Sequence, residues 1–359
     1  MSCLRVRGYT VGHWCAGLVL AAMAVGTLAL AQEAAGFSDG PSVQPPTQAP
    51  APIEREPPPE AQPGAATQGT QQKQDAGYQA PGSNYDPALF QRPIPKDQLA
   101  FLSQFAGMPS NQLYRDKQFR KLMHDFVPDC TFHYGSDKSM FDALDQVIQG
   151  SNEPVVVRDG RYVMLSGHMG PFLAGKGFLW IDMQDGIGIG AFYFHPTNGE
   201  PTPAVNVFSK QVQKEMLLDW SELPPAFDED VTRWEQADRV APLTVRYFIT
   251  GSNKKILLEH DEDYCAPESG AGYNDCDQMN ADAADDDMTA ALYLEQTRHV
   301  TNATAWMIND PDQIAWIGVR DRRCGGVIDP LGCRVVMSRQ RTREILHAPP
   351  ARPVHPIHR

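Results

Sequence analysis

Residues 155–195 read VVVRDGRYVMLSGHMGPFLAGKGFLWIDMQDGIGIGAFYFH, and this segment is the strongest predictor of the fold. It contains two Asp-Gly steps, Asp159-Gly160 and Asp185-Gly186, each between runs of apolar or β-branched residues. An Asp-Gly step in this setting indicates a β-hairpin, because both residue types tolerate the positive φ angles of a tight turn. The sequence therefore predicts two hairpins, with strands at Val155–Arg158, Arg161–Ser166, Gly177–Met183 and Ile187–His195.

Helical patterns precede the two hairpins. Apolar residues recur at helical spacing in Gln112–Phe126, where Ser110 is the expected N-cap, and again in Asp137–Gln149. A fifth strand is expected at Ala204–Val212, after a polar loop that contains prolines. We therefore expect an α+β fold in which an antiparallel β-meander packs on helices, with residues 96–215 forming this domain.

The second half of the chain is expected to add a connection and a small helical domain. Residues 216–262 are predicted to form a helix, interrupted at Pro224-Pro225, and a β-hairpin that turns at Gly251-Ser252-Asn253. Beyond this hairpin a small helical domain is expected over residues 263–347, and the composition favours helices from about Gln278 onward. The last two of these helices are predicted at Asp310–Arg322 and Cys333–Leu346.

The two ends of the chain are expected to lie outside the folded part. Arg5 and Arg7, an apolar run and the triplet Ala29-Leu30-Ala31 predict a secretory signal peptide over residues 1–31. Residues 32–95 are rich in proline, glutamine, alanine and glycine, which favours a disordered tether. Residues 348–359 are expected to be a flexible tail. The expected location is therefore periplasmic or secreted, with no membrane span after signal cleavage.

The charge of the chain restricts the class of partner. The formal net charge is −13, and loss of a signal peptide that holds Arg5 and Arg7 but no acid would make it −15. A nucleic-acid partner is disfavoured, since phosphate binding requires a basic face. An acidic protein instead attracts basic partners. Twelve acids and no lysine or arginine lie between Glu259 and Glu295, and the simplest interpretation of this block is a solvated face.

Five cysteines follow the expected signal peptide, namely Cys130, Cys265, Cys276, Cys324 and Cys333. In an oxidising compartment four of them are expected to form two disulfides. The residues alone leave three pairings open for any four cysteines, and one cysteine is left over. Metal binding by these cysteines is the weaker alternative, because no Cys-x-x-Cys pair occurs.

No catalytic motif is recognised in the sequence. Candidate catalysts or metal ligands are His133, His168 and His195. None of them lies in a motif whose spacing would let residues of one helix or strand bind a metal together. The acidic runs Asp261–Asp263 and Asp285–Asp287 could bind calcium, although neither has the spacing of an EF-hand loop. We therefore expect no catalytic residue, no metal and no cofactor.

A pattern in the C-terminal part resembles a known family. Cys265 and Cys276 are followed by further landmarks at Trp316, Arg320-Asp321, Cys324, Cys333, Ser338, Arg341-Thr342 and Ile345. Their order and spacing resemble the LprI-type lysozyme-inhibitor domain, whose pattern has two cysteines, then W-x-x-x-R-D-x-x-C and C-x-x-x-x-T-x-x-R-T-x-x-L. The chain departs from this pattern at Ser338, in place of threonine, and at Ile345, in place of leucine.

The LprI resemblance implies a disulfide pairing and a set of scaffold residues. It pairs Cys265 with Cys276 and Cys324 with Cys333, which leaves Cys130 unpaired. We expect Asp321 to pair with a nearby arginine and Trp316 to pack between helices. The scaffold residues implied by the family motif are Trp316, Arg320, Asp321, Arg341 and Thr342.

A second resemblance covers the middle of the chain. The strand that ends at Ser166-Gly167, the loop after it and the next strand are similar to the inhibitor-of-vertebrate-lysozyme (Ivy) family. In that family the loop reads C-K-P-H-D-C and places a histidine in the lysozyme cleft. Here His168 and Leu173 occupy the cysteine positions, and Pro171 occupies the histidine position. The resemblance implies an inhibitory loop at His168, Met169, Gly170, Pro171 and Phe172, with His168 as the candidate anchor.

These features lead to one main expectation. The protein is expected to bind and inhibit a basic lysozyme or another peptidoglycan-cleaving hydrolase. One alternative is an immunity protein against a secreted wall hydrolase, and another is a scaffolding protein of the envelope. A third is an envelope-biogenesis enzyme that uses His168 and His195. Convergence of these two histidines on a carboxylate in a deep pocket would favour the enzyme, whereas a protruding 168–176 loop would favour the inhibitor.

Overall fold

A computed structural model of the chain describes residues 83–133, 137–168, 175–194, 204–240, 244–260, 263–265, 275–298 and 310–349. The expected signal peptide lies outside these ranges, as do most of the expected tether and tail. Among the described residues, no helix combines the length and the apolar character that a membrane crossing requires.

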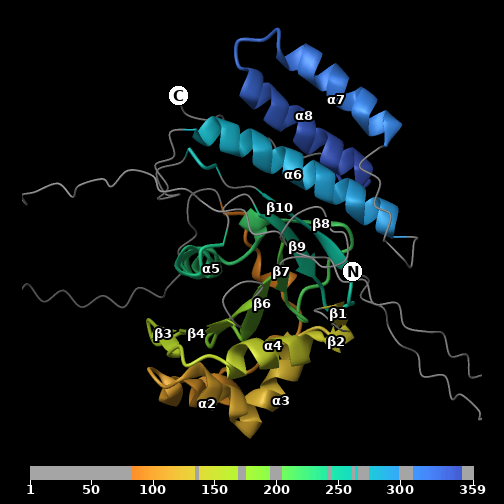
Figure 1. Cartoon of the computed structure of the whole chain (residues 1–359). Helices are drawn as coiled ribbons and strands as arrows, with labels where there is room; N and C mark the ends of the chain where they lie inside the picture. The colour runs from red at the N-terminus through yellow and green to blue at the C-terminus, as the bar shows by residue number, and fades with distance from the viewer. Residues whose placement is uncertain are drawn as a thin grey trace, which may run out of the picture. The chain divides into compact units, whose positions relative to one another are not determined.

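The described part of the chain is built around a sheet of eight strands in the order β3-β4-β5-β6-β7-β9-β10-β8 (Figure 1). Neighbouring strands are antiparallel, except that β7 and β9 are parallel and so are β10 and β8. The strands are β3 Val156–Arg158, β4 Tyr162–His168, β5 Lys176–Asp182, β6 Ile187–Phe194, β7 Ala204–Phe208, β8 Leu217–Asp219, β9 Val245–Ile249 and β10 Lys255–Glu259. The predicted α+β class is confirmed, but the sheet is mixed rather than a purely antiparallel meander.

The mixed topology arises from the segment after β7. Residues 216–262 add β8, β9 and β10 to the same sheet instead of forming a separate connection. Helix α5 (Pro225–Ala237) lies between β8 and β9 and allows the chain to return parallel to β7. The expected helix before Pro224 is instead the strand β8 and a 3-10 turn, η3 (Trp220–Glu222).

The predicted turns have the backbone geometry that their residues favour. Asp159 and Gly160, between β3 and β4, have φ angles of 56° and 61°, as a two-residue hairpin turn requires. Asn253, between β9 and β10, has a φ angle of 61°. All three hairpins expected from the turn residues are present in the sheet.

The N-terminal helices differ from the prediction at their boundaries. The expected helix Gln112–Phe126 is divided into α2 (Ser110–Arg115) and α3 (Lys117–Phe126). Asp116 separates them because its carboxylate accepts hydrogen bonds from the first backbone N–H groups of α3, as an N-cap does. Ser110 is the first residue of α2 rather than its N-cap.

The next expected helix begins later than predicted. Helix α4 spans Met140–Gln149, and Ser139 caps it. The residues before it form the strand β2 (Asp137–Ser139), which pairs with β1 (Thr131–His133). The remaining short elements before α2 are η1 Pro87–Leu89, α1 Lys96–Leu99 and η2 Ala100–Phe105.

Helices cover both faces of the sheet (Figure 1). One face packs on α2, α3 and α4, with Phe126, Leu144 and Leu165 in the shared core. The opposite face packs on α5 through Trp180 and Phe227. The glycines of β6 allow this packing, because a Cβ atom at Gly188 would lie 2.2 Å from the ring of Phe126.

The C-terminal helices are α6 (Cys276–Thr297), α7 (Pro311–Cys324) and α8 (Pro330–Ile345). They form the expected disulfide-linked helical part. A third core joins Ala290, Ala291 and Tyr293 of α6 to Tyr247 and Leu257 of the sheet. Alternation along β9 places Tyr247 on the same face as Ile249, which contacts the α2–α4 core.

The end of the expected tether is held against the sheet. The backbone N–H of Gln91 donates to Gln211, and the backbone N–H of Ile94 donates to the carbonyl of Gly186, at 2.7 and 2.9 Å. Phe90 is buried in the core on the α5 side. Residues 83–95 therefore belong to the folded part.

Candidate functional site

The candidate site lies where the loop between β4 and β5 begins. We use "edge cluster" for Glu153, Ser166, His168 and Asp238. The Nδ1 atom of His168 is 3.0 Å from Oε1 of Glu153, and Ser166 donates a hydrogen bond to Oε2 of the same carboxylate. Ligand-type atoms of Glu153, His168 and Asp238 all lie within 4.8 Å of one another. The candidate anchor His168 thus lies beside two carboxylates.

Strand alternation explains why the edge cluster forms. Ser166 and His168 are two apart on β4, so they lie on one face of the sheet. Gly167 faces the other way, where a Cβ atom would lie 2.7 Å from the carbonyl oxygen of Val147 in α4. Asp238 is the residue after α5, the helix that covers the face of Ser166 and His168. Glu153 is positioned by its carbonyl, which accepts a hydrogen bond from the N–H of Ser110 at 2.7 Å.

The electrostatics of the edge cluster are dominated by its two acids. Burial raises the pKa of Asp238, and the nearby charge of Glu153 raises it further, while Lys176 and His168 act in the opposite direction. Lys176 faces His168 across the β4–β5 ladder. The Oδ2 atom of Asp238 is buried, and the indole of Trp234 lies near this carboxylate without hydrogen-bonding geometry to Oδ2. The cluster therefore suits a positively charged group.

The structure describes only part of the predicted inhibitory loop. His168 is the last residue of β4, and its side chain is 54% exposed. Met169, Gly170, Pro171 and Phe172 lie outside the described residues. The predictions for His195 and for the side chain of His133 also fall outside them. The two observations that would separate the enzyme from the inhibitor, convergence of His168 with His195 and a protruding 168–176 loop, therefore rest on residues outside the described ranges.

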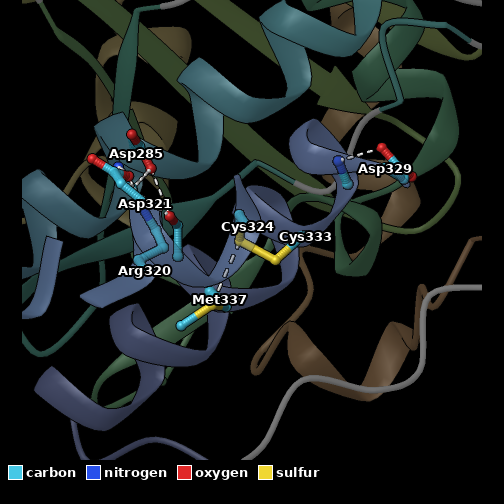
Figure 2. Close-up of a disulfide and its surroundings, with 9 residues drawn as sticks. Asp285, Arg320, Asp321, Cys324, Asp329, Cys333 and Met337 are labelled. Atoms are coloured by element: carbon cyan, nitrogen blue, oxygen red, sulfur yellow. Dashed lines mark hydrogen bonds and ion pairs between the residues drawn. A yellow bond between two sulfur atoms is a disulfide. The ribbon is translucent and has the colours of Figure 1, made fainter. Parts of the chain in front are cut away.

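The cysteines pair as the LprI resemblance implies. Cys265 and Cys276 form a disulfide with a Cα–Cα distance of 5.0 Å, and Cys324 and Cys333 form another at 5.5 Å (Figure 2). Cys130 takes part in neither disulfide and is buried in the core between the sheet and the N-terminal helices.

The remaining landmarks of the LprI pattern lie in one connected cluster. Arg320 donates to Asp285 at 2.5 Å and to Ser338 at 3.0 Å, and Ser338 donates to the same carboxylate at 2.6 Å. Arg320 also pairs with Asp321, as Figure 2 shows beside the disulfide. Arg334 completes the cluster with a 2.7 Å bond to Asp285. We call these five residues the arginine cluster.

Trp316 and the end of the pattern lie beside the arginine cluster. The guanidinium groups of Arg320 and Arg341 lie 5.7 and 5.6 Å from the ring centre of Trp316, so this ring is held between α7 and α8. The hydroxyl of Thr342 donates to the carbonyl of Ser338. The positions expected to be scaffold are therefore in contact with one another.

Two acids of the acidic block, Glu259 and Asp287, are buried, while Asp275 and Asp277 are exposed as a solvated face predicts. Asp287 accepts hydrogen bonds from the backbone N–H of His260 at 2.7 Å and interacts with its Nδ1 atom at 2.6 Å, and both side chains are 1% exposed. Glu259 and Asp219 share Arg343. Burial and the neighbouring Asp219 raise the pKa of Glu259 to about 9, against the effect of Arg343.

Several large apolar side chains are exposed on the helices that carry the LprI pattern. Ile314 and Val319 lie on α7, Val336 lies on α8, and Val327 and Ile328 lie in the loop between them. Ile328 is 98% exposed.

Comparisons with protein-family models, with curated proteins and with solved structures find no match to this chain.

Proposed function

We propose that the protein is an exported binding protein that inhibits a lysozyme or another peptidoglycan-cleaving hydrolase. The observation that carries this proposal is the contact among the LprI landmarks. Trp316 and Arg320 lie on α7 and Ser338 and Arg341 lie on α8, yet Arg320 bonds Ser338 and Arg341 lies over the ring of Trp316. Residues that matched a pattern by chance would have no reason to meet in space. The contact therefore supports a shared domain and, through it, a shared activity.

The edge cluster offers a suitable anchor for a hydrolase cleft. His168 is half-exposed, and Glu153 and Ser166 fix the position of its ring on the sheet. An imidazole that is already oriented loses less conformational entropy when it enters a cleft. Lysozyme-type clefts carry two carboxyl groups, which a protonated or hydrogen-bonding histidine can contact.

The internal acids change the expected role of net charge. A negative protein speeds encounter with a basic hydrolase, and salt weakens this effect. However, Asp285 and Glu259 are paired with arginines inside the protein. We therefore expect the long-range attraction to be smaller than the net charge of −13 implies.

The test is a turbidity assay of wall lysis. Purified protein is titrated against animal-type, goose-type, invertebrate-type and phage lysozymes at low and high salt. Inhibition of one class that His168→Ala weakens by about tenfold or more is the expected result, by analogy with the loss of a central anchor. His124→Ala, at an exposed histidine of α3, is the matched control and should inhibit normally. Absence of inhibition with every class, at large excess of protein, contradicts the general proposal and favours a dedicated immunity protein.

The second candidate is an envelope enzyme, which the edge cluster specifically favours. Glu153 and Asp238 place two carboxylates beside His168, and the raised pKa of Asp238 would suit a general acid. In that case isolated peptidoglycan fragments should be converted by the protein alone. Glu153→Gln and Asp238→Asn should abolish the conversion without changing the circular dichroism spectrum. Unchanged fragments after prolonged incubation would remove this candidate.

A further inference from the structure

We infer that the edge cluster is a binding site for a divalent transition metal of the zinc class. Three side chains that are distant in sequence supply it, namely Glu153, His168 and Asp238. This inference does not depend on the proposed function, because metal binding is measured with no hydrolase present.

The chemistry of the ligands selects the class of metal. One imidazole nitrogen and two carboxylate oxygens suit zinc, manganese or ferrous iron, whereas calcium and magnesium prefer oxygen ligands alone. Zinc binds such atoms at about 2.0–2.2 Å, so neighbouring ligand atoms in a tetrahedral site lie about 3.3 Å apart. The Nδ1 atom of His168 and Oε1 of Glu153 are 3.0 Å apart, close to this spacing. Rotation of the Asp238 side chain would bring the third ligand to the same centre.

The surroundings hold two of the ligands in place. Ser166 donates to Oε2 of Glu153 and leaves Oε1 directed at His168. Metal ligands are commonly oriented by such outer hydrogen bonds. Asp238 is half-buried, and its Oδ2 atom is buried beside the indole of Trp234, whose interaction lowers the pKa of this carboxyl only in part against the effect of burial. A bound cation would stabilise the charged form of this carboxyl.

The number of protein ligands defines the type of site. Three ligands leave one position of a tetrahedral zinc centre open, as in zinc sites that bind water or an external group. The half-exposed side chain of His168 places this position at the surface of the sheet. Lys176 opposes binding, because it places a positive charge beside Asp238.

The experiment is isothermal titration of metal-free protein with zinc chloride, with cobalt(II) as a spectroscopic probe. One zinc ion per chain and a visible cobalt absorption of the tetrahedral type are expected. His168→Ala and Asp238→Asn should each weaken zinc binding by more than about 100-fold, and Ser166→Ala should weaken it by about 10–100-fold. Lys176→Met should strengthen it, because it removes the opposing charge. The variants are compared by circular dichroism, so that loss of fold is distinguished from loss of a ligand.

The controls separate this site from other histidines. His124→Ala removes an exposed imidazole from α3, and His355→Ala with His358→Ala removes those of the C-terminal tail; neither change should alter binding at the site. Zinc binding that survives His168→Ala but disappears with the tail histidines would overturn the inference. Absence of both heat and a cobalt spectrum would also overturn it, and would identify the cluster as an ion pair between His168 and its two acids.

Discussion

The sheet region and the helical region of this protein are stabilised in different ways. The sheet region comprises β3–β10 with α2–α5, and its interior is filled by large apolar side chains such as Trp180, Phe126 and Phe208. The helical region comprises α6–α8. Its largest element, α6, buries mainly alanines, and charged groups such as Arg320 and Asp287 are buried beside them.

Because of this difference, we expect different substitutions to destabilise the two regions. Burial of apolar surface stabilises the sheet region, at about 25 cal/mol per Å² removed from water. The helical region depends on ion pairs that compensate the desolvation of their own charges, and on two disulfides. Removal of one charge or one disulfide should therefore destabilise the helical region more than the sheet region.

The largest effect is expected from Asp285→Ala. This carboxylate accepts bonds from Arg320, Arg334 and Ser338, and the side chain of Arg320 is only 6% exposed. Removal of one partner from a buried ion pair costs about 3–5 kcal/mol. The loss should lie toward the lower end of this range, because the buried Arg320 keeps its pair with the exposed carboxylate of Asp321. Chemical denaturation should show this loss, and hydrogen exchange should place it in α6–α8.

Asp312→Ala, at an exposed position in the first turn of α7, is the matched control and should change stability little. Equal loss of hydrogen-exchange protection in β4, β5 and β6 would contradict the comparison. It would mean that both regions unfold as one cooperative unit.

The same contrast explains what could be predicted from the sequence. The hairpins of the sheet region were predictable, because Asp159-Gly160 and Asp185-Gly186 act through local backbone preferences. The parallel pairing of β7 with β9 was not, because it depends on where the chain returns after α5. The break between α2 and α3 was also missed, although Asp116 is a recognisable N-cap residue.

The candidate site was predicted only in part. His168 was selected from a family resemblance, but Glu153 and Asp238 lie 15 residues before it and 70 residues after it. No local pattern links residues at such distances, so the edge cluster is visible only once the strands and α5 are placed. The ion pairs within the acidic block were not predictable for the same reason, since the arginines that pair with Asp285 come from α7 and α8.

The next largest effect is expected from loss of the disulfide between Cys324 and Cys333. The bond closes a loop with a sequence separation of 9, which the chain-entropy model values at about 2–3 kcal/mol. Cys324→Ala with Cys333→Ala should lower the stability of the helical region by this amount, measured by denaturation under oxidising conditions. Because the double variant lacks the bond between Cys324 and Cys333, a reducing agent cannot destabilise it by breaking that bond. If the sheet region lost protection equally, the two regions would not be energetically separate.

Asp286→Asn is expected to have a smaller effect, and to stabilise the protein where the two earlier changes destabilise it. Burial raises the pKa of Asp286 to about 6, with His260 opposing and Asp287 adding to the shift. A raised carboxyl pKa means that the folded state binds the extra proton, so stability falls as pH rises from about 4 to about 6 and stays lower above that range. The variant should therefore be more stable than the parent protein by about 1–2 kcal/mol at pH 7–8, after allowance for solvent screening.

The pH profile provides the control for this prediction. Near pH 4 the parent carboxyl is protonated in the folded state, so Asp286→Asn should have little effect there. Asp312→Asn, at an exposed carboxyl of α7, should have no comparable pH-dependent effect. A stabilisation that is independent of pH would mean that the charge of Asp286 is not its cause.

The smallest changes in stability are expected when one glycine of each region is replaced by alanine. Gly160 in the β3–β4 turn has a φ angle of 61°, and a Cβ atom there would meet no atom within 4 Å. Gly160→Ala should therefore cost only the backbone strain of the left-handed conformation, about 1 kcal/mol. Gly326, between the disulfide-bonded cysteines of the helical region, also has open space but no left-handed φ angle. Gly326→Ala should leave stability unchanged or raise it by a few tenths of a kcal/mol, because it restricts the unfolded chain. Because neither substitution creates a clash, thermal denaturation of the pair isolates the backbone contribution in each region. Equal losses in both variants would contradict the distinction between a turn set by backbone conformation and a loop held by its disulfide.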